Sequence, residues 1–408
     1  MRVIDETRTV VIPDHVPPHL VWADDVARFA SEMDDPYIAI ARLSDGPEII
    51  WATSANFGEP AWVPTRHSII EDVFMDADSF ISGENNTIGA LIGVDWKLNP
   101  LEIDPPQHTR YRRILQPWFV PSAISRLHGQ IVQIADDLIG DFRSKGGCEF
   151  IGEFASKFPS LIFLDLMGLP RDKLTEFMQW ERAFLHGLTP EERAAGAGAI
   201  AAYLETTTDE RRHAPPRDDL ISHIISAEVD GRPLDRGEIM GMCMVLYVGG
   251  LDTVMSSLGW YFMHLAGDQA LQARLRKSPS DIPDAVDDLL RAYGVTSVPR
   301  RVSRDMVFHG VHLKKGDVMM TPTYLAGRDP RKYDRPEIVD PDRKARHLTL
   351  ATGVHNCLGI HLAKREIAVV LQAFLSRFEN IRIAHGERIE WHAGGTWGID
   401  RLPLVWDC

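Results

Sequence analysis

The sequence predicts a mainly α-helical protein with a minor β part, built as one domain over residues 1–408. Helical spacing of apolar residues recurs in several long segments, which favours amphipathic helices. The stretch "GMCMVLYVGGLDTVMSSLGWYFMHLA" (241–266) is apolar on every face, as in a helix buried on all sides. Strand-like alternation is confined to short segments, so the sheets are expected to be small.

In the first part of the chain, residues 22–33 are predicted to be helical, 37–52 strand-like and 66–76 helical. Residues 81–104 are rich in Gly, Asn and Pro and are predicted to be irregular. The Pro pair in "DPPQHTRYRRIL" predicts a turn and then a helix from about His108. Further helices are predicted at 123–144, 171–186, 191–212 and 219–229.

After the apolar helix, short helices are predicted at 268–277 and 283–293, and paired strands within 306–320. A long coil over 326–357 leads to a helix at 358–378, and short strands follow. No repeat, low-complexity segment or linker separates autonomous domains, which favours a single domain.

Composition bounds the kind of protein. The chain is 44% hydrophobic and 25% charged, as expected for a globular protein with a large core, and its net charge of −14 argues against general nucleic-acid or anionic-membrane binding. The start "MRVIDETRTVVIPDHVPPHL" lacks the apolar core of a signal peptide, so a cytoplasmic protein is expected. Four widely spaced cysteines predict neither a disulfide framework nor a Cys-rich zinc site.

The apolar stretch 241–266 is also long enough to cross a membrane. It contains Asp252, His264 and the Gly249–Gly250 pair, and "LDRGEIM" precedes it as an amphipathic helix start. A helix through the middle of the core is therefore expected, and no membrane association.

Cys357 stands in "ATGVHNCLGIHLAKREI", just before a predicted helix. Helix-start N–H groups would stabilise a thiolate there, and Gly353 and Gly359 would let the backbone approach a flat, bulky group. Three other interpretations remain open on the residues alone. A small buried hydrophobe is common for a free cysteine, a zinc site with His355 and His361 lacks a fourth ligand, and a nucleophile needs a base.

The segment "GVHNCLGIHLAKREI" resembles the haem-binding loop of the cytochrome P-450 superfamily, the haem-thiolate monooxygenases. The resemblance implies that Cys357 is the axial ligand of the iron of haem b, where a thiolate favours O–O cleavage. It also implies the triangular, mainly helical P-450 prism, with the haem between the helices at 237–266 and 358–378. Leu350 and Ala351 depart from the Phe and Gly that are usual in the family.

The segment "GGLDTV" (249–254) resembles the oxygen-activation motif of the same family. Gly249 and Gly250 would leave room for dioxygen, Thr253 would donate a hydrogen bond to it, and Asp252 would relay protons. The plainer alternative is a helix packed closely at glycine, with a surface Asp and a Thr bonded back to the helix. A carboxylate in so apolar a run favours the functional interpretation.

Two further sets of residues match the family. "DDLLR" (287–291) offers Asp288 and Arg291, with Arg343 downstream, in place of a Glu–Arg–Arg network; Asp is one methylene shorter than Glu. His108, Arg112, Arg300 and His355 fall where the family binds the haem propionates. Each alone would more often be a surface group.

Within the family, the chain is most similar to the soluble bacterial, camphor-hydroxylating type, from about residue 80 onward. The resemblance implies a pocket for a small apolar substrate, lined by Thr87, Trp96, Leu98, Leu101, Val245, Val248, Val295, Val298, Gly395 and Thr396. Trp96 replaces the tyrosine that holds the camphor ketone, so a cyclic terpenoid or norisoprenoid ketone such as an ionone is expected instead of camphor. Several of these residues would alternatively only pack the core.

The resemblance also implies O2 as co-substrate and electrons from a 2Fe–2S ferredoxin with an NADH-dependent ferredoxin reductase. Arg110, Arg113, Lys344 and Arg346 would form a positive surface for an acidic donor, or are scattered surface charge. A monomer is expected. The alternatives are a haem-thiolate sensor without turnover, a camphor-type hydroxylase and a peroxide-driven enzyme.

Overall fold

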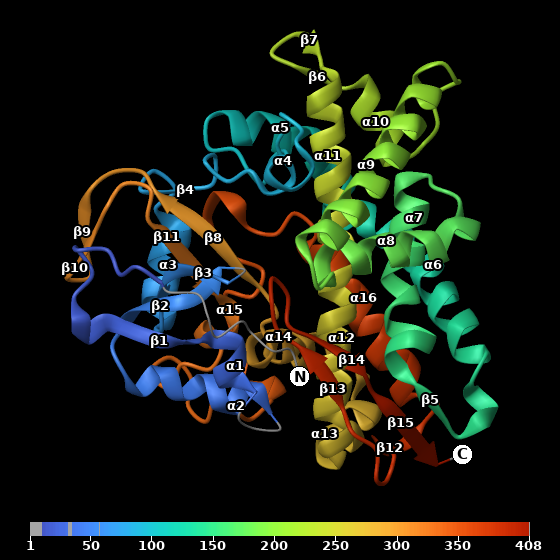
Figure 1. Cartoon of the computed structure of the whole chain (residues 1–408). Helices are drawn as coiled ribbons and strands as arrows, with labels where there is room; N and C mark the ends of the chain where they lie inside the picture. The colour runs from blue at the N-terminus through green and yellow to red at the C-terminus, as the bar shows by residue number, and fades with distance from the viewer. Residues whose placement is uncertain (1–9, 32–34, 57, 408) are drawn as a thin grey trace.

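The computed structural model describes residues 10–31, 35–56 and 58–407, and Figure 1 shows a helical part beside a smaller part rich in strands. This confirms the predicted class, mainly α with a minor β part. The α-helices are α1 (Val26–Ala30), α2 (Pro36–Ala41), α3 (His67–Met75), α4 (Thr87–Ile92), α5 (Gln107–Leu115), α6 (Pro121–Gly140), α7 (Lys157–Met167), α8 (Leu174–His186), α9 (Pro190–Arg212), α10 (Leu220–Ser226), α11 (Arg236–Gly250), α12 (Asp252–Gly267), α13 (Gln269–Lys277), α14 (Ile282–Ala292), α15 (Thr323–Ala326) and α16 (Ile360–Leu375).

The largest sheet has six strands in the order β1-β2-β3-β11-β8-β4, and it mixes parallel and antiparallel pairs. Its strands are β1 (Val21–Asp25), β2 (Ile49–Asn56), β3 (Glu59–Pro64), β4 (Phe80–Ile81), β8 (Ser297–Val302) and β11 (Val318–Pro322). The small sheets contain β5 (Gly147–Glu149), β6 (Glu228–Val229), β7 (Arg232–Pro233), β9 (Met306–Phe308), β10 (Val311–Leu313), β12 (Glu379–Ile383), β13 (Glu390–His392), β14 (Gly398–Arg401) and β15 (Pro403–Asp407).

The predictions for the first fifty residues were partly wrong. The segment 22–33 begins as β1 and turns helical only at Val26, and residues 32–34 lie outside the described residues. The segment 37–52 begins as α2, because Pro36 opens a helix and the Asp35 carboxylate caps it by accepting a hydrogen bond from Tyr37 N–H at 2.8 Å. The capped first turn therefore forms a helix, although the residues that follow it favour a strand.

Besides α2, three helices were missed: α4, α7 and the four-residue α15. α7 is apolar on nearly all faces and almost wholly buried, so it shows no amphipathic spacing to detect. α4 lies in the Gly-rich segment 81–104, where turn-forming residues hid a single short helix. The other predicted helices are present, with ends that differ by a few residues.

The long apolar stretch forms α11 and α12, which meet at Leu251 (φ −108°, ψ −71°). α11 starts with a capping box, in which Asp235 accepts from Glu238 N–H and Glu238 accepts from Asp235 N–H. The span Arg236–Gly267 is long and apolar enough to cross a membrane, but 67% of its most apolar window is buried inside the protein. It is the core helix that the sequence led us to expect.

Candidate functional site

Cys357 lies in the loop that precedes α16. Its N–H donates to the Leu350 carbonyl at 2.8 Å, and a single 3-10 turn, Gly353–His355, comes before it. Gly353 has φ +70°, and a Cβ there would come within 2.6 Å of the Phe74 carbonyl oxygen, so both conformation and space require glycine. Burial raises the pKa of the Cys357 thiol, opposed by a hydrogen bond from Gly359 N–H and by the Arg112 charge. The expected lowering by the helix start is thus outweighed by burial, and the thiolate needs a bound cation.

The four predicted propionate-binding residues come together beside this loop. The rings of His108 on α5 and His355 lie with centroids 4.3 Å apart, and Arg112 donates to the Asn356 amide oxygen at 2.8 Å. Arg300 on β8 is 5% exposed and lies over the Phe74 ring. Residues from α5, β8 and the cysteine loop therefore form one cationic cluster.

The electrostatics of the cluster fit an anionic group. Burial, reinforced by Arg112, lowers the pKa of His108 to about 4, and burial lowers that of Arg300 to about 10. His108 Nδ1 and His355 Nε2 are buried without a hydrogen-bond partner among the residues the structure describes. A negatively charged hydrogen-bond acceptor stabilises both the buried N–H donors that lack a partner and the neighbouring positive charges that repel one another. The two carboxylates of a haem provide such an acceptor, so the residues fit that group.

The motif 249–254 lies at the junction of α11 and α12. A Cβ on Gly249 would meet nothing within 4 Å, and Gly249 is exposed although Tyr247 and Leu251 are buried, so open space adjoins the middle of a core helix. A Cβ on Gly250 would lie 2.9 Å from the Phe163 ring. Thr253 Oγ1 donates to the Gly249 carbonyl at 3.1 Å, which is the back-bonded arrangement.

Asp252 is not a surface residue. It is 1% exposed, and its Oδ1 lies 2.9 Å from His186 Nε2 at the end of α8. Burial, the largest single influence, raises the pKa of this carboxyl, but the hydrogen bond and charge of His186, the charge of His392 and a hydrogen bond with Thr396 together bring the pKa below its ordinary value. A charged carboxylate is therefore held one residue before Thr253.

The predicted acid–arginine network forms with Asp in place of Glu. Asp288 and Arg291 are both 0% exposed and are joined by two hydrogen bonds, at 2.6 and 3.1 Å. Arg343 Nε lies 3.2 Å from the same carboxylate, which also accepts from Asp340 N–H at 2.6 Å. Arg291 donates further to the carbonyls of Gly327, Pro336 and Ile338. This network fixes the coil before the cysteine loop against α14.

The predicted substrate-lining residues fall into two groups. Val245 and Val248 lie on α11 toward Gly249. Val295 lies just before β8, and Val298 lies in that strand. Thr396 forms an isolated antiparallel β-bridge with Thr296. Its side chain also hydrogen-bonds Asp252, which lowers the pKa of that carboxyl. Gly395 precedes Thr396, so this loop lies beside the 249–254 motif.

The second group lies in α4 and in the segment that follows it. Trp96 packs at the first turn of α11. A Cβ added at Gly237 would lie 3.1 Å from the Cβ of Trp96. Leu98 is buried, whereas Leu101 is 39% exposed and Thr87 is also exposed. The buried Glu102 carboxylate accepts from Thr87 N–H at 2.7 Å and from Leu98 N–H at 3.1 Å, so it holds this segment in place.

Sequence reasoning missed Glu102 and His186. Glu102 is followed two residues later by the "DPP" turn, and an acid in a Gly-rich, Asn-rich segment is a candidate for binding backbone N–H groups. His186 carried no signal, because only the folded chain brings the end of α8 to the start of α12.

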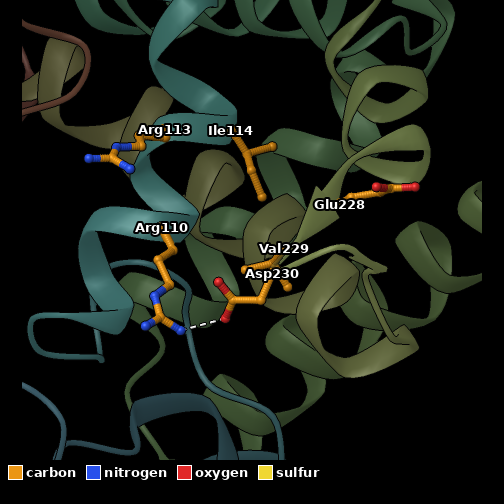
Figure 2. Close-up of a pocket in the computed structure, with 6 residues that line it drawn as sticks. All are labelled: Arg110, Arg113, Ile114, Glu228, Val229 and Asp230. Atoms are coloured by element: carbon orange, nitrogen blue, oxygen red, sulfur yellow. Dashed lines mark hydrogen bonds and ion pairs between the residues drawn. The ribbon is translucent and has the colours of Figure 1, made fainter.

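A pocket of about 340 Å³ lies between α5 and the β6–β7 hairpin. Figure 2 shows Arg110 joined to Asp230 across it, with Arg113 directed away. Val229 and Ile114 form its apolar floor, and Glu228 lies at its rim.

Known proteins were compared with this chain. The family model described as Cytochrome P450 matches residues 175–280 and 283–390. The chain is 32% identical to the "Probable cytochrome P450 127A1" of Sinorhizobium fredii, over 98% of both chains. It resembles the crystal structures of CYP101J2 (32% identity) and CYP101C1 (30% identity), each with TM-score 0.86 over 98% of this chain and 100% of the other. The chain therefore belongs to the cytochrome P450 family.

Proposed function

We propose that this protein is a cytoplasmic, ferredoxin-dependent monooxygenase that hydroxylates a small apolar cyclic substrate, a terpenoid or norisoprenoid ketone of the ionone type. Membership of the family makes it a haem b monooxygenase, and substrate and electron donor are the parts we propose. The overall reaction balances as R–H + O2 + 2 electrons + 2 protons giving R–OH + H2O. Haem b, when bound, supplies the activation of dioxygen and the oxidation of the C–H bond.

The proposed residue roles follow the site. Cys357 is the iron ligand, and His108, Arg112, Arg300 and His355 hold the haem carboxylates. Thr253 donates a hydrogen bond at the dioxygen site once it leaves the Gly249 carbonyl. The Asp252 carboxylate takes up a proton and passes it on toward that site. The observation that carries the proposal is the charged, buried Asp252 next to Thr253, where open space adjoins Gly249. A haem protein that only senses a ligand needs no buried acid there.

The substrate assignment rests on the pocket residues. Val245 and Val248 lie on α11 toward Gly249, while Trp96 packs at the first turn of the same helix. A substrate that reaches from the dioxygen site toward Trp96 is longer than camphor and apolar over most of its length. The indole N–H can donate to a ketone at the far end.

The substrate test is a spectral titration of the ferric protein with β-ionone and with camphor. Displacement of water from the iron converts low to high spin, and we expect a shift at least five-fold larger at saturation with β-ionone. A larger camphor response would instead favour a camphor-type hydroxylase.

The mechanistic test is Thr253→Ala. With a ferredoxin and its reductase, this variant should still oxidise NADH but release peroxide in place of most of the product. The matched control is Thr206→Ala, because Thr206 Oγ1 likewise bonds back to a helix carbonyl, Ala202 at 3.0 Å, on exposed α9. Substrate-independent NADH consumption with no product in the unmodified protein would favour a sensor. Product formed from peroxide alone, with or without Thr253, would favour a peroxide-driven enzyme.

A further inference from the structure

A row of acids and imidazoles runs from the protein surface to Asp252. His186 Nε2 lies 2.9 Å from Asp252 Oδ1, and the ring of His186 lies 4.3 Å, centroid to centroid, from that of His392. His392 Nδ1 in turn lies 3.0 Å from Asp400 Oδ1. The side chain of Asp252 is 2% exposed and that of Asp400 is 45% exposed, so the row joins the core to solvent.

Local structure places each member. His186 is the last residue of α8, and His392 and Asp400 lie on the antiparallel β13–β14 hairpin, which runs beside α12 in Figure 1. Gly398 pairs with His392, and a Cβ at Gly398 would fall 2.7 Å from the imidazole Cε1 and 2.7 Å from Ser256 Oγ. Glycine at this position therefore leaves room for the ring to lie between the hairpin and α12.

Titratable and charged groups on α8 and β14, which pack against the two histidines, lie beside the row. α8 contributes Glu181 and Arg182, and β14 contributes Asp400. Burial and the nearby Asp252 raise the pKa of Glu181 well above its ordinary value. Partial burial raises the pKa of Asp400, but the hydrogen bond and charge of His392 and the charges of His186 and Arg182 together bring it below its ordinary value. Each imidazole thus contacts a carboxylate that stays charged.

We propose that His392 and His186 relay protons from solvent at Asp400 to Asp252. This inference rests on the proposed function. An imidazole can take up a proton on one ring nitrogen and release one from the other. His392 takes a proton at Nδ1 beside Asp400 and releases one from Nε2, which is buried and has no partner among the described residues.

His186 takes up that proton, directly or through one water, and releases one from Nε2 to Asp252 Oδ1. Each imidazole ends with as many protons as it began, and no electron moves. The relay therefore adds no chemistry of its own and sets the supply of the two protons that the reaction consumes.

The first experiment measures product formed per NADH between pH 6 and 8.5 in His392→Gln and His186→Gln. Glutamine keeps a hydrogen-bond donor but carries no titrating proton. We expect at least a three-fold loss of coupled product, more peroxide and a changed pH profile, with unchanged haem content and substrate-induced spin shift. The matched control is His15→Gln, since His15 forms an equally short pair with Asp317 (2.9 Å) at similar exposure. Unaltered coupling and pH profile in both relay variants would overturn the proposal.

The second experiment needs no turnover. Histidine imidazole signals are titrated by NMR in the ferrous carbon monoxide form, which is diamagnetic. Asp252→Asn should shift the imidazole resonances of His186, since the charged partner of the ring is removed, and Asp400→Asn should shift those of His392. Independence of the two histidines from these carboxylates would contradict the relay even in a protein that turns over its substrate. If both histidines respond to loss of their carboxylates but no substrate is found, only the proposed function is contradicted.

Discussion

At the scale of single residues, buried charge is the most demanding feature of this protein. Asp288 and Arg291 are wholly buried, and the guanidinium satisfies its donors with the carboxylate and three backbone carbonyls. Breaking a buried pair leaves one uncompensated charge, which costs about 3–5 kcal/mol. The same carboxylate accepts a hydrogen bond from Asp340 N–H, which ties α14 to the coil at Asp340.

We therefore expect Asp288→Asn to lower the free energy of unfolding by about 3 kcal/mol, because Arg291 loses its counter-charge. Thermal unfolding and the yield of haem-loaded protein measure this. Asp284→Asn, in the first turn of the same helix, should cost less than about 1 kcal/mol. Equal losses in the two variants would mean that the buried pair has no special role.

His264 predicts a pH dependence of stability. Burial lowers its pKa to about 4, and it bonds the Tyr293 hydroxyl through Nδ1 at 2.9 Å. Between pH 4 and 6.5 the unfolded chain protonates this histidine and the folded one does not, so stability rises with pH across that window. The difference amounts to about 3 kcal/mol, at 1.36 kcal/mol per pKa unit.

The check is thermal unfolding at pH 4.5 and at pH 7 for the wild type and for His264→Gln. The variant should lose less stability on acidification than the wild type. The same slope in both proteins would assign the acid sensitivity to other groups.

At the scale of elements, glycines decide how closely the chain packs on α11. A Cβ on Gly241 would overlap the Lys97 carbonyl oxygen, so the segment after α4 lies directly on the helix backbone. Backbone atoms cannot rotate out of the way as a side chain can. The close approach fixes residues 97–99, and with them the position of Trp96.

Gly241→Ala should therefore displace residues 97–99, lower the unfolding temperature and weaken the β-ionone spin shift. Gly129→Ala is the contrasting variant, because a Cβ on Gly129, in α6, meets nothing within 4 Å. It should gain about 0.5–1 kcal/mol from the helix propensity of alanine. A Gly241→Ala protein as stable as the Gly129→Ala protein would show that the approach is loose.

At the scale of the whole molecule, a net charge of −14 makes any positive surface distinctive. Arg113, Lys344 and Arg346 are exposed, and Arg110 is paired with Asp230 across the pocket of Figure 2. The Arg110 charge is thus partly neutralised, and Arg113 is the freer cation on α5. An acidic electron donor would be steered to this face.

Arg113→Glu should raise the KM for a 2Fe–2S ferredoxin several-fold at low salt, with a smaller effect at high ionic strength because charges are screened. Arg143→Glu, exposed after the end of α6, is the control and should leave that KM unchanged. Initial rates of cytochrome reduction at two salt concentrations measure both. An effect of equal size in the two variants would indicate bulk charge and not a docking surface.

The sequence allowed the class, most helices and the members of the cationic cluster to be predicted, because periodicity and local motifs carry that information. It did not predict α7, which lacks a polar face, nor the short capped α2. It placed Asp252 in a buried helix but not its partner, since His186 and His392 reach it from remote segments. It also expected a helix start to lower the pKa of Cys357, whereas burial, which a single sequence does not show, dominates.

The small sheet β12-β15-β5 has a consequence for how the protein is made. Its middle strand is β15, and Gly147 of β5 pairs with Val405. During synthesis β5 emerges early and must wait, unpaired on that edge, until residues 403–407 have been translated. The π-turn Ile151–Ala155 and α7 follow β5 directly, and Phe150 N–H donates to the Leu402 carbonyl at 2.9 Å. The helical part can therefore complete its packing only late in translation, which makes the nascent chain dependent on protection from aggregation until then.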